Sequence, residues 1–142
     1  MTSQQTGSSW TAAVVLVARL IFVAVFAMAT AFKLGDIGAT ADYIASEGFP
    51  APALLAWLAV VFELGLIACL ATGAYFSEAA LVATAYVLFL AFAFHGPSHW
   101  AANQAEFGFF VDHFTFVAGL LFAAAHGPGR VLSVKAGLLR LT

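Results

Sequence analysis

An acid and a base stand side by side inside one of the most apolar stretches of the chain. Residues 107–125 have the sequence FGFFVDHFTFVAGLLFAAA, and Asp112 and His113 are the ionisable residues in it. A carboxylate and an imidazole can exchange protons, bind a metal ion or pair with a charge of opposite sign. Because a carboxylate among acyl chains is penalised or protonated, we expect both side chains to face other polar groups.

Two more histidines, His95 and His99, precede this stretch at a spacing of four residues, which places side chains on one face of a helix. With His113, and with Asp112 or Glu106, they are candidate ligands for copper, zinc or iron. A glycine and a proline lie between the two, and the spacing matches no established metal motif. The alternative interpretation is that these histidines lie at the level of the lipid head groups.

The amino-acid composition indicates whether these residues are surrounded by water or by lipid. Of the 142 residues, 63% are hydrophobic and 8% are charged, and the mean hydropathy is +1.01. Soluble domains carry about 25% charged residues, so this chain lacks the polar surface of a soluble domain and is predicted to lie in lipid. Five basic residues give no footprint for nucleic acid, and the single cysteine, Cys69, excludes an internal disulfide.

Four apolar runs are long enough to cross a membrane. They cover about residues 11–34, 52–75, 76–95 and 107–125, and each is close to the ~20 residues that a spanning helix needs. Helix is expected because backbone polar groups in lipid must bond within their own segment. The sequence therefore predicts an all-α membrane protein, an up-and-down bundle of four transmembrane helices that forms one domain over residues 1–142.

A short interfacial helix is expected between the first two spans. Asp36 is a suitable cap, and the apolar residues that follow fall on one face at helical spacing. These residues are Ile37, Ala41, Ile44 and Ala45. Gly48 and Pro50 are expected to end the helix.

The charged residues inside the spans can be paired by depth. At ~1.5 Å of rise per residue, Glu63 lies roughly 16 Å and Arg19 roughly 22 Å from the outer ends of their helices. An arginine side chain bridges that difference, so we predict a buried Arg19–Glu63 ion pair. Lys33 lies at the level of Asp112, His113, His95 and His99, which predicts a polar cluster at the outer face. In this cluster Asp112 is expected to meet Lys33, and His113 is expected to turn toward His95.

The orientation follows from the basic residues of the C-terminal region. Arg130, Lys135 and Arg140 follow the last span, whereas residues 1–18 contain no lysine or arginine. Cytoplasmic segments are enriched in these residues, so both termini are predicted to be cytoplasmic.

Several short motifs follow one another along the chain in a defined order. They are Arg19, then VFAMATAFKL ending in Lys33 and Leu34, then GFPAP, then Glu63 and Gly65, and finally GPGR followed by Ser133. This order resembles the DoxX family of small bacterial membrane proteins, over roughly residues 17–133. The resemblance implies a four-helix bundle in the bacterial cytoplasmic membrane, with Arg19, Lys33 and Glu63 as signature polar residues. The chain departs from the family pattern at Glu78, where a basic residue is usual.

The resemblance also implies a function, because the wider group is named for a subunit of a thiosulfate:quinone oxidoreductase. We therefore expect a membrane subunit of a quinone-linked or thiol- or sulfur-linked oxidoreductase assembly, in which catalytic residues are not identified. Fifteen phenylalanines fit a flat quinone pocket, and they equally fit a surface that faces lipid. The alternatives are a small-molecule or metal-binding module at the outer face, with His95, His99 and His113 as ligands, or an anchor for another protein. Expected partners are the lipid bilayer and a second subunit or a second copy of the chain, and not nucleic acid.

Overall fold

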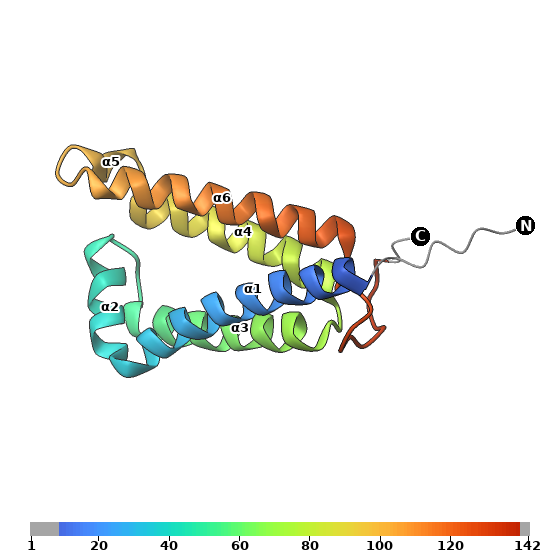
Figure 1. Cartoon of the computed structure of the whole chain (residues 1–142). Coiled ribbons are helices and arrows are strands. Elements are labelled where there is room, and N and C mark those ends of the chain that lie inside the picture. Colours follow the sequence, from blue (N-terminus) through green and yellow to red (C-terminus); the bar gives the residue numbers. More distant parts are fainter. Residues whose placement is uncertain (1–8, 140–142) are drawn as a thin grey trace, which may run out of the picture.

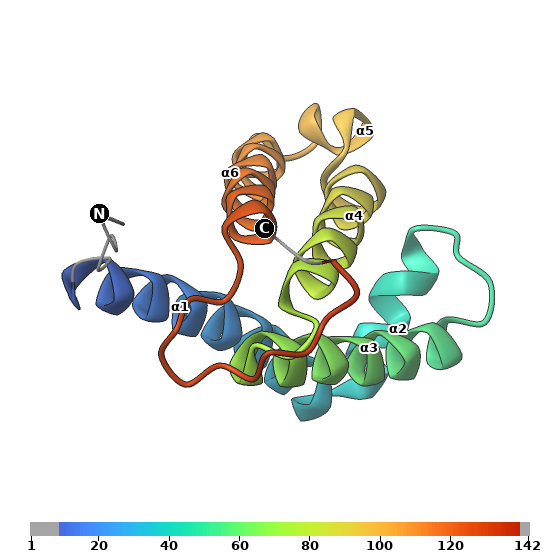
Figure 2. The ribbon, with the colours of Figure 1, turned by 90° about the vertical axis from the view of Figure 1, so that its right-hand side faces the viewer.

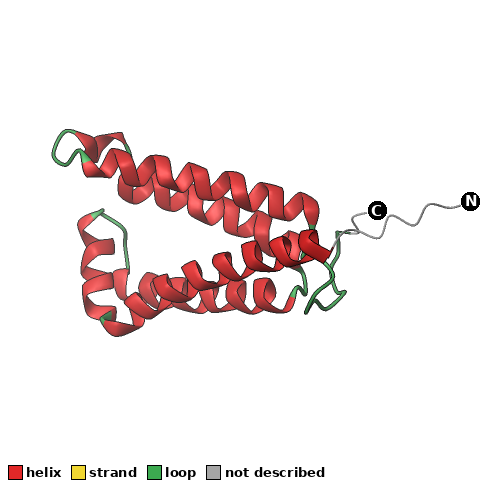
Figure 3. Cartoon of the chain, viewed as in Figure 1, coloured by secondary structure: helices red, strands yellow, loops and turns green. Residues whose placement is uncertain are grey.

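The computed structural model describes residues 9–139, and all regular structure in this range is helical (Figures 1 and 3). The elements are α1 (Ser9–Gly35), α2 (Ile37–Ser46), α3 (Pro52–Thr72), α4 (Phe76–His95), α5 (Pro97–Trp100) and α6 (Ala105–His126). Four spans are long and apolar enough to cross a membrane, namely α1, α3, α4 continued into α5, and α6. The predicted all-α membrane fold with four spanning helices is confirmed.

The short interfacial helix forms where the sequence placed it. The Asp36 side chain caps α2, because its Oδ1 accepts a hydrogen bond of 2.8 Å from the Ala39 amide. Ile44 is the buried residue of α2, and Gly48 follows the helix with a φ of 80°, a conformation that glycine adopts without strain. The second span ends at Thr72 rather than at residue 75, because Gly73 takes the left-handed conformation at its C-cap.

The four long helices form two antiparallel pairs that diverge. α1 packs along α3, and α4 packs along α6, whereas the tight turn from Gly73 to Tyr75 joins α3 to α4. The pairs meet at the end that carries this turn and separate toward α2 and α5 (Figures 1 and 2). We call these the closed end and the open end. The divergence of the pairs is a feature that the sequence did not predict.

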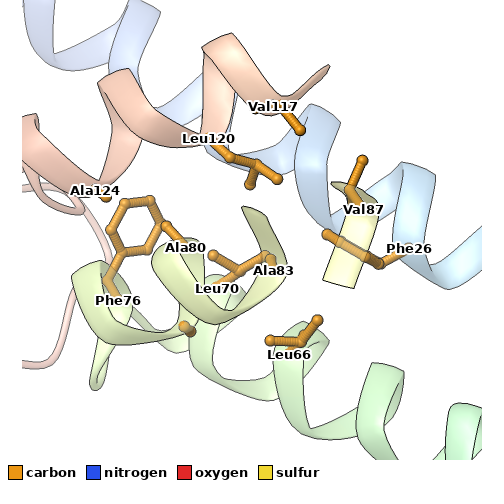
Figure 4. Close-up of a cluster of buried hydrophobic side chains, with 11 residues drawn as sticks. Phe26, Leu66, Leu70, Phe76, Ala80, Ala83, Val87, Val117, Leu120 and Ala124 are labelled. Atoms are coloured by element: carbon orange, nitrogen blue, oxygen red, sulfur yellow. The ribbon is translucent and has the colours of Figure 1, made fainter. Parts of the chain in front are cut away.

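Small side chains let the helices approach one another in the core. Along α4, Phe76, Ala80, Ala83, Val87 and Ala91 form one buried stripe at helical spacing. All of them except Ala91 belong to an apolar cluster with residues of α3, α6 and α1, whose other labelled members are Leu66, Leu70, Phe26, Val117, Leu120 and Ala124 (Figure 4). In lipid, where apolar contact alone does not drive association, such small-residue faces allow the close packing that holds helices together.

The segment after α6, residues 127–139, folds back across the closed end, and we call it the tail (Figure 2). The Val134 amide donates to the Thr72 carbonyl at 2.8 Å, and the Tyr75 amide donates to the Ala136 carbonyl at 2.6 Å. The tail passes so close to the α3–α4 turn that a Cβ at Gly73 would lie 2.8 Å from the Ser133 Cβ.

Candidate functional site

A pocket of about 1130 Å³ lies between the diverging helix pairs, and we call it the wedge pocket. Its walls are mostly apolar and aromatic, with contributions from α1, α2, α3, α4 and α6. The aromatic residues in its lining are Phe32, Tyr43, Phe49, Phe62, Tyr86, Phe89 and Phe94. Lys33, Asp36, Thr40, His95 and His113 are its other polar or ionisable lining residues. Apolar walls with a few convergent polar groups are typical of small-molecule sites, and the volume suits a large ligand.

A buried carboxylate stands beside this pocket. The Glu63 side chain is 1% exposed, and both of its oxygens accept hydrogen bonds. Oε1 lies 2.8 Å from the Lys33 Nζ and 2.8 Å from the Tyr86 hydroxyl. Oε2 lies 2.9 Å from the Thr30 hydroxyl and 3.1 Å from the same Nζ. We call these four residues the Glu63 network, which connects α1, α3 and α4 and so links the two helix pairs.

The predicted Arg19–Glu63 ion pair is wrong. Arg19 is buried, but its guanidinium donates to two carbonyls of the tail, those of Pro128 and Leu132, each at 2.8 Å. Glu63 pairs instead with Lys33, whose side chain is 22% exposed. Counting residues places Lys33 near the outer end of its helix, but the helices do not end at one level, and the long lysine side chain reaches further inward.

Two histidines of the predicted outer cluster come together on the wall of the wedge pocket. The rings of His95 on α4 and His113 on α6 have centroids 5.0 Å apart, as expected for this pair. His113 Nδ1 lies 2.7 Å from the Phe109 carbonyl, and because a carbonyl can only accept, Nδ1 carries the proton. His95 Nδ1 lies 2.6 Å from a carboxylate oxygen of Glu106 and donates to it. The Nε2 atom of each ring is therefore the nitrogen left for a ligand.

The rest of that cluster does not form. Asp112 is exposed on α6, and Lys33, its predicted partner, is held by Glu63. His99 Nε2 pairs with Glu47 Oε2 at 2.9 Å, so it joins α5 to the end of α2 and does not line the pocket. Among residues 9–139 no three histidine, cysteine, aspartate or glutamate side chains converge as metal ligands, so the geometry gives no support to the metal site of His95, His99 and His113.

Aromatic rings join the two helix pairs along one side of the pocket. Phe49, which follows α2, lies against both Phe89 and Phe94 of α4, with ring centroids 5.9 and 5.8 Å apart. Tyr43 of α2 lies 5.2 Å from the Phe94 ring. Burial, and then the carboxylates of Glu106 and Glu47, raise the pKa of Tyr43, so its hydroxyl stays protonated as a donor in the pocket lining.

Sequence reasoning missed three members of these networks. Tyr86 and Thr30 donate to Glu63, and Glu47 bridges to His99. A signal existed for the first two, because a carboxylate inside a membrane needs several donors and few hydroxyl groups face the interior of the spans. No comparable signal marked Glu47, which follows a short helix and meets a residue 52 positions away.

The geometry suits recognition of an apolar molecule that carries oxygen atoms at separate positions. A hydrogen-bond donor lies on one wall, at Lys33, and imidazole nitrogens lie on another, at His95 and His113. Between them the lining is aromatic, which provides flat surfaces for a ring system.

Comparison with protein families gives one match. A family model described as DoxX matches residues 14–96, which cover most of α1 and all of α2, α3 and α4 and include Arg19 and the whole Glu63 network. Comparisons with curated proteins and with solved structures give no match.

Proposed function

The chain belongs to the DoxX family of small integral membrane proteins, and from this premise we propose that it binds a quinone in the wedge pocket as the membrane subunit of an oxidoreductase assembly. The observation that carries the proposal is the Glu63 network beside an aromatic pocket open to a large ligand. A quinone has a flat ring, an apolar chain and two carbonyl oxygens, and each of these features has a counterpart in the lining.

The two polar walls are assigned different roles in this proposal. Lys33, held in place by Glu63, faces one carbonyl oxygen as a donor, because its ammonium has three protons. The hydroxyl of Tyr86 donates its proton to Glu63 and so keeps that carboxylate in position. His95 and His113 face the second oxygen through Nε2, where an imidazole can accept or return a proton as the ligand changes between quinone and quinol. The electrons pass to or from a partner subunit in this scheme.

The thiol- or sulfur-linked part of the expected function is assigned to that partner. Cys69 packs beside the apolar core and does not line the wedge pocket. A sulfur reaction therefore has no thiol within the lining, whereas the quinone side of such a reaction has the groups described above. The proposed role of this chain is to hold the quinone.

The distribution of charge supports placing the closed end in the cytoplasm. The tail, with Arg130 and Lys135, lies at this end, whereas the open end carries most of the carboxylates. Those of the open end are Asp36, Asp42, Glu47, Glu106 and Asp112. Lysine and arginine are enriched on the cytoplasmic side of membrane proteins, so we infer that α2 and α5 face outward.

Binding of short-chain quinones to the purified protein tests the proposal. We expect saturable binding of a short-chain benzoquinone or naphthoquinone in mild detergent, measured by calorimetry. Ala59→Phe, which fills the pocket from α3, is expected to weaken binding at least tenfold. Ala53→Phe is the matched control, because Ala53 is exposed on the same helix outside the lining, and it is expected to bind as the unmodified protein does.

A smaller effect is expected for Tyr86→Phe, which keeps the ring and removes one of the hydrogen bonds that position Glu63, and through it Lys33. The loss of a direct hydrogen bond to the ligand would weaken binding roughly 2- to 12-fold, and this indirect loss should stay at or below that range. Absence of saturable binding of both quinone types by the unmodified protein would contradict the proposal. Equal binding by the Ala59→Phe and Ala53→Phe proteins would remove the ligand from the wedge pocket.

A further inference from the structure

The tail is firmly held although it has no regular secondary structure. Its carbonyls accept from the buried Arg19, and two of its amides, those of Leu138 and Leu139, donate to the Glu78 carboxylate. It also fits closely against α1, because a Cβ at Gly129 would lie 2.8 Å from a methyl carbon of Val15. The tail therefore has a defined surface, and the side chains on that surface are placed by the fold.

This defined surface carries large apolar side chains that point away from the protein. Leu132 is 77% exposed and Leu138 is 82% exposed, and Val131, Val134 and Leu139 are also exposed. None of them belongs to a spanning helix, so the hydrocarbon core around the spans does not by itself account for them. Exposed aliphatic groups on a well-ordered segment at the end of a membrane bundle fit the boundary between acyl chains and head groups, where they are removed from water.

Basic side chains precede and interrupt this run of apolar ones. Arg130 and Lys135 are exposed, and together with His126 they line a second pocket of about 1060 Å³. We call it the tail pocket, and the start of α1 and the α3–α4 turn form its other walls. Within the described part of the chain Glu78 is the carboxylate of this lining, and it is engaged by the tail amides.

We propose that the tail pocket binds the head group of an anionic phospholipid. The phosphate lies at Lys135 and Arg130, and the acyl chains lie along the exposed leucines of the tail. Alternation of cations with exposed aliphatic groups is the pattern by which a surface segment binds an acidic leaflet, since charge attracts the head group and apolar burial holds the chains. The buried Arg19 is a positioning residue, because its bonds to the Pro128 and Leu132 carbonyls fix the turn on which Leu132 is presented.

This site is separate from the wedge pocket, which opens at the other end of the molecule, and it does not depend on the proposed quinone function. The basic side chains and the apolar surface of the tail contribute to lipid binding in ways that can be measured separately. The cations discriminate between head groups, whereas the leucines act on any lipid with the same chains. Inorganic phosphate shares the charge of the head group but has no chains, so it separates a lipid site from a simple anion site.

Titration of the full chain in mild detergent with dioctanoyl phosphatidylglycerol, dioctanoyl phosphatidylcholine and inorganic phosphate tests the proposal. Thermophoresis measures the affinities. We expect the phosphatidylglycerol to bind at least tenfold more tightly than the phosphatidylcholine, and we expect no saturable binding of phosphate. Each cation near an acidic head group contributes about 1 kcal/mol, so Lys135→Gln should weaken phosphatidylglycerol binding about fivefold and leave phosphatidylcholine binding unchanged.

Two further variants complete the design. Leu138→Ser is expected to weaken both lipids by a similar factor, because it removes apolar contact and no charge. Lys135→Arg keeps the charge and should bind phosphatidylglycerol within about twofold of the unmodified protein. Equal affinity for the two lipids would overturn the proposal, as would unchanged discrimination after Lys135→Gln. Phosphate binding that competes with phosphatidylglycerol and survives Leu138→Ser would show an anion site instead of a lipid site.

Discussion

The ion pair between Lys33 and Glu63 makes a quantitative prediction, because its atoms are 2.8 Å apart and the carboxylate is buried. At an effective dielectric constant near 20, two unit charges at this distance attract by about 6 kcal/mol. Removing both charges from water offsets much of this attraction, yet removing one partner leaves a buried charge and typically costs about 3–5 kcal/mol. Lys33→Met should therefore destabilise by about 3 kcal/mol, at the lower end because Thr30 and Tyr86 still donate to the carboxylate.

A double-mutant cycle isolates the pair. Glu63→Gln alone should cost less than Lys33→Met, because the partly exposed ammonium can turn toward water. The double variant should be more stable than the sum of the single effects by at least ~2 kcal/mol. Unfolding by SDS in mixed micelles, followed by tryptophan fluorescence, measures each free energy. The control cycle combines Arg19→Met with Glu63→Gln and should be additive within ~0.5 kcal/mol. Coupling of Glu63 to Arg19 rather than to Lys33 would refute this assignment of partners.

Two more predictions concern the closed end. Arg19→Met removes both bonds to the tail carbonyls, so trypsin should cleave the tail roughly tenfold faster or more. Lys33→Met should leave this cleavage rate unchanged. Equal rates in the Arg19→Met and unmodified proteins would show that the Arg19 bonds do not hold the tail. Gly73→Ala should destabilise by about 1–3 kcal/mol, because its φ is +78° and the new Cβ would lie 2.8 Å from the Ser133 Cβ. Gly65→Ala is the control, because the space around Gly65 is open, and it should be neutral or stabilising by up to ~1 kcal/mol. SDS unfolding measures both free energies. Equal losses of stability in the two variants would argue against the close approach of the tail to Gly73.

The sequence predicted the helices well because helices in lipid are defined by length and hydropathy. The four spans agree with the structure to within a few residues, and Asp36 caps α2 as expected. These features depend on neighbouring residues along the chain, since a span needs about 20 apolar positions and a cap needs one side chain at a helix start. Local rules suffice for both.

The pairing of charges needed information that no local rule contains. Counting residues from the helix ends pairs Lys33 with Asp112 and Arg19 with Glu63, because the count treats the helices as parallel and as ending at the same depth. In the structure the pairs diverge, and the partner of Glu63 comes from near the end of α1. Once helices tilt, a depth estimated from the residue count can be wrong by a few helical turns. An error of that size is enough to assign the wrong cation to a carboxylate.

The tail shows a different limit of sequence reasoning. Its basic residues predicted an orientation, but its packing onto the closed end was not predicted because it has no periodic pattern. The signal available was Arg19 itself, a cation deep in a span that must find acceptors. Those acceptors need not be carboxylates. Helix C-termini attract cations, so the backbone carbonyls that follow the last span, in and after the Gly-Pro-Gly turn, are also candidate partners of Arg19.

The bonds from Arg19 to the tail have a consequence for the order of assembly during synthesis. The acceptors at Pro128 and Leu132 lie 109 and 113 residues after Arg19, so α1 is made long before they exist. At about 5–20 residues per second, the guanidinium waits roughly 5–20 s for them. Lys33 meets its own partner only 30 residues later. Closure of the bundle is therefore expected to be the last event in biogenesis, and a nascent chain that stops at α6 keeps an uncompensated cation in the membrane.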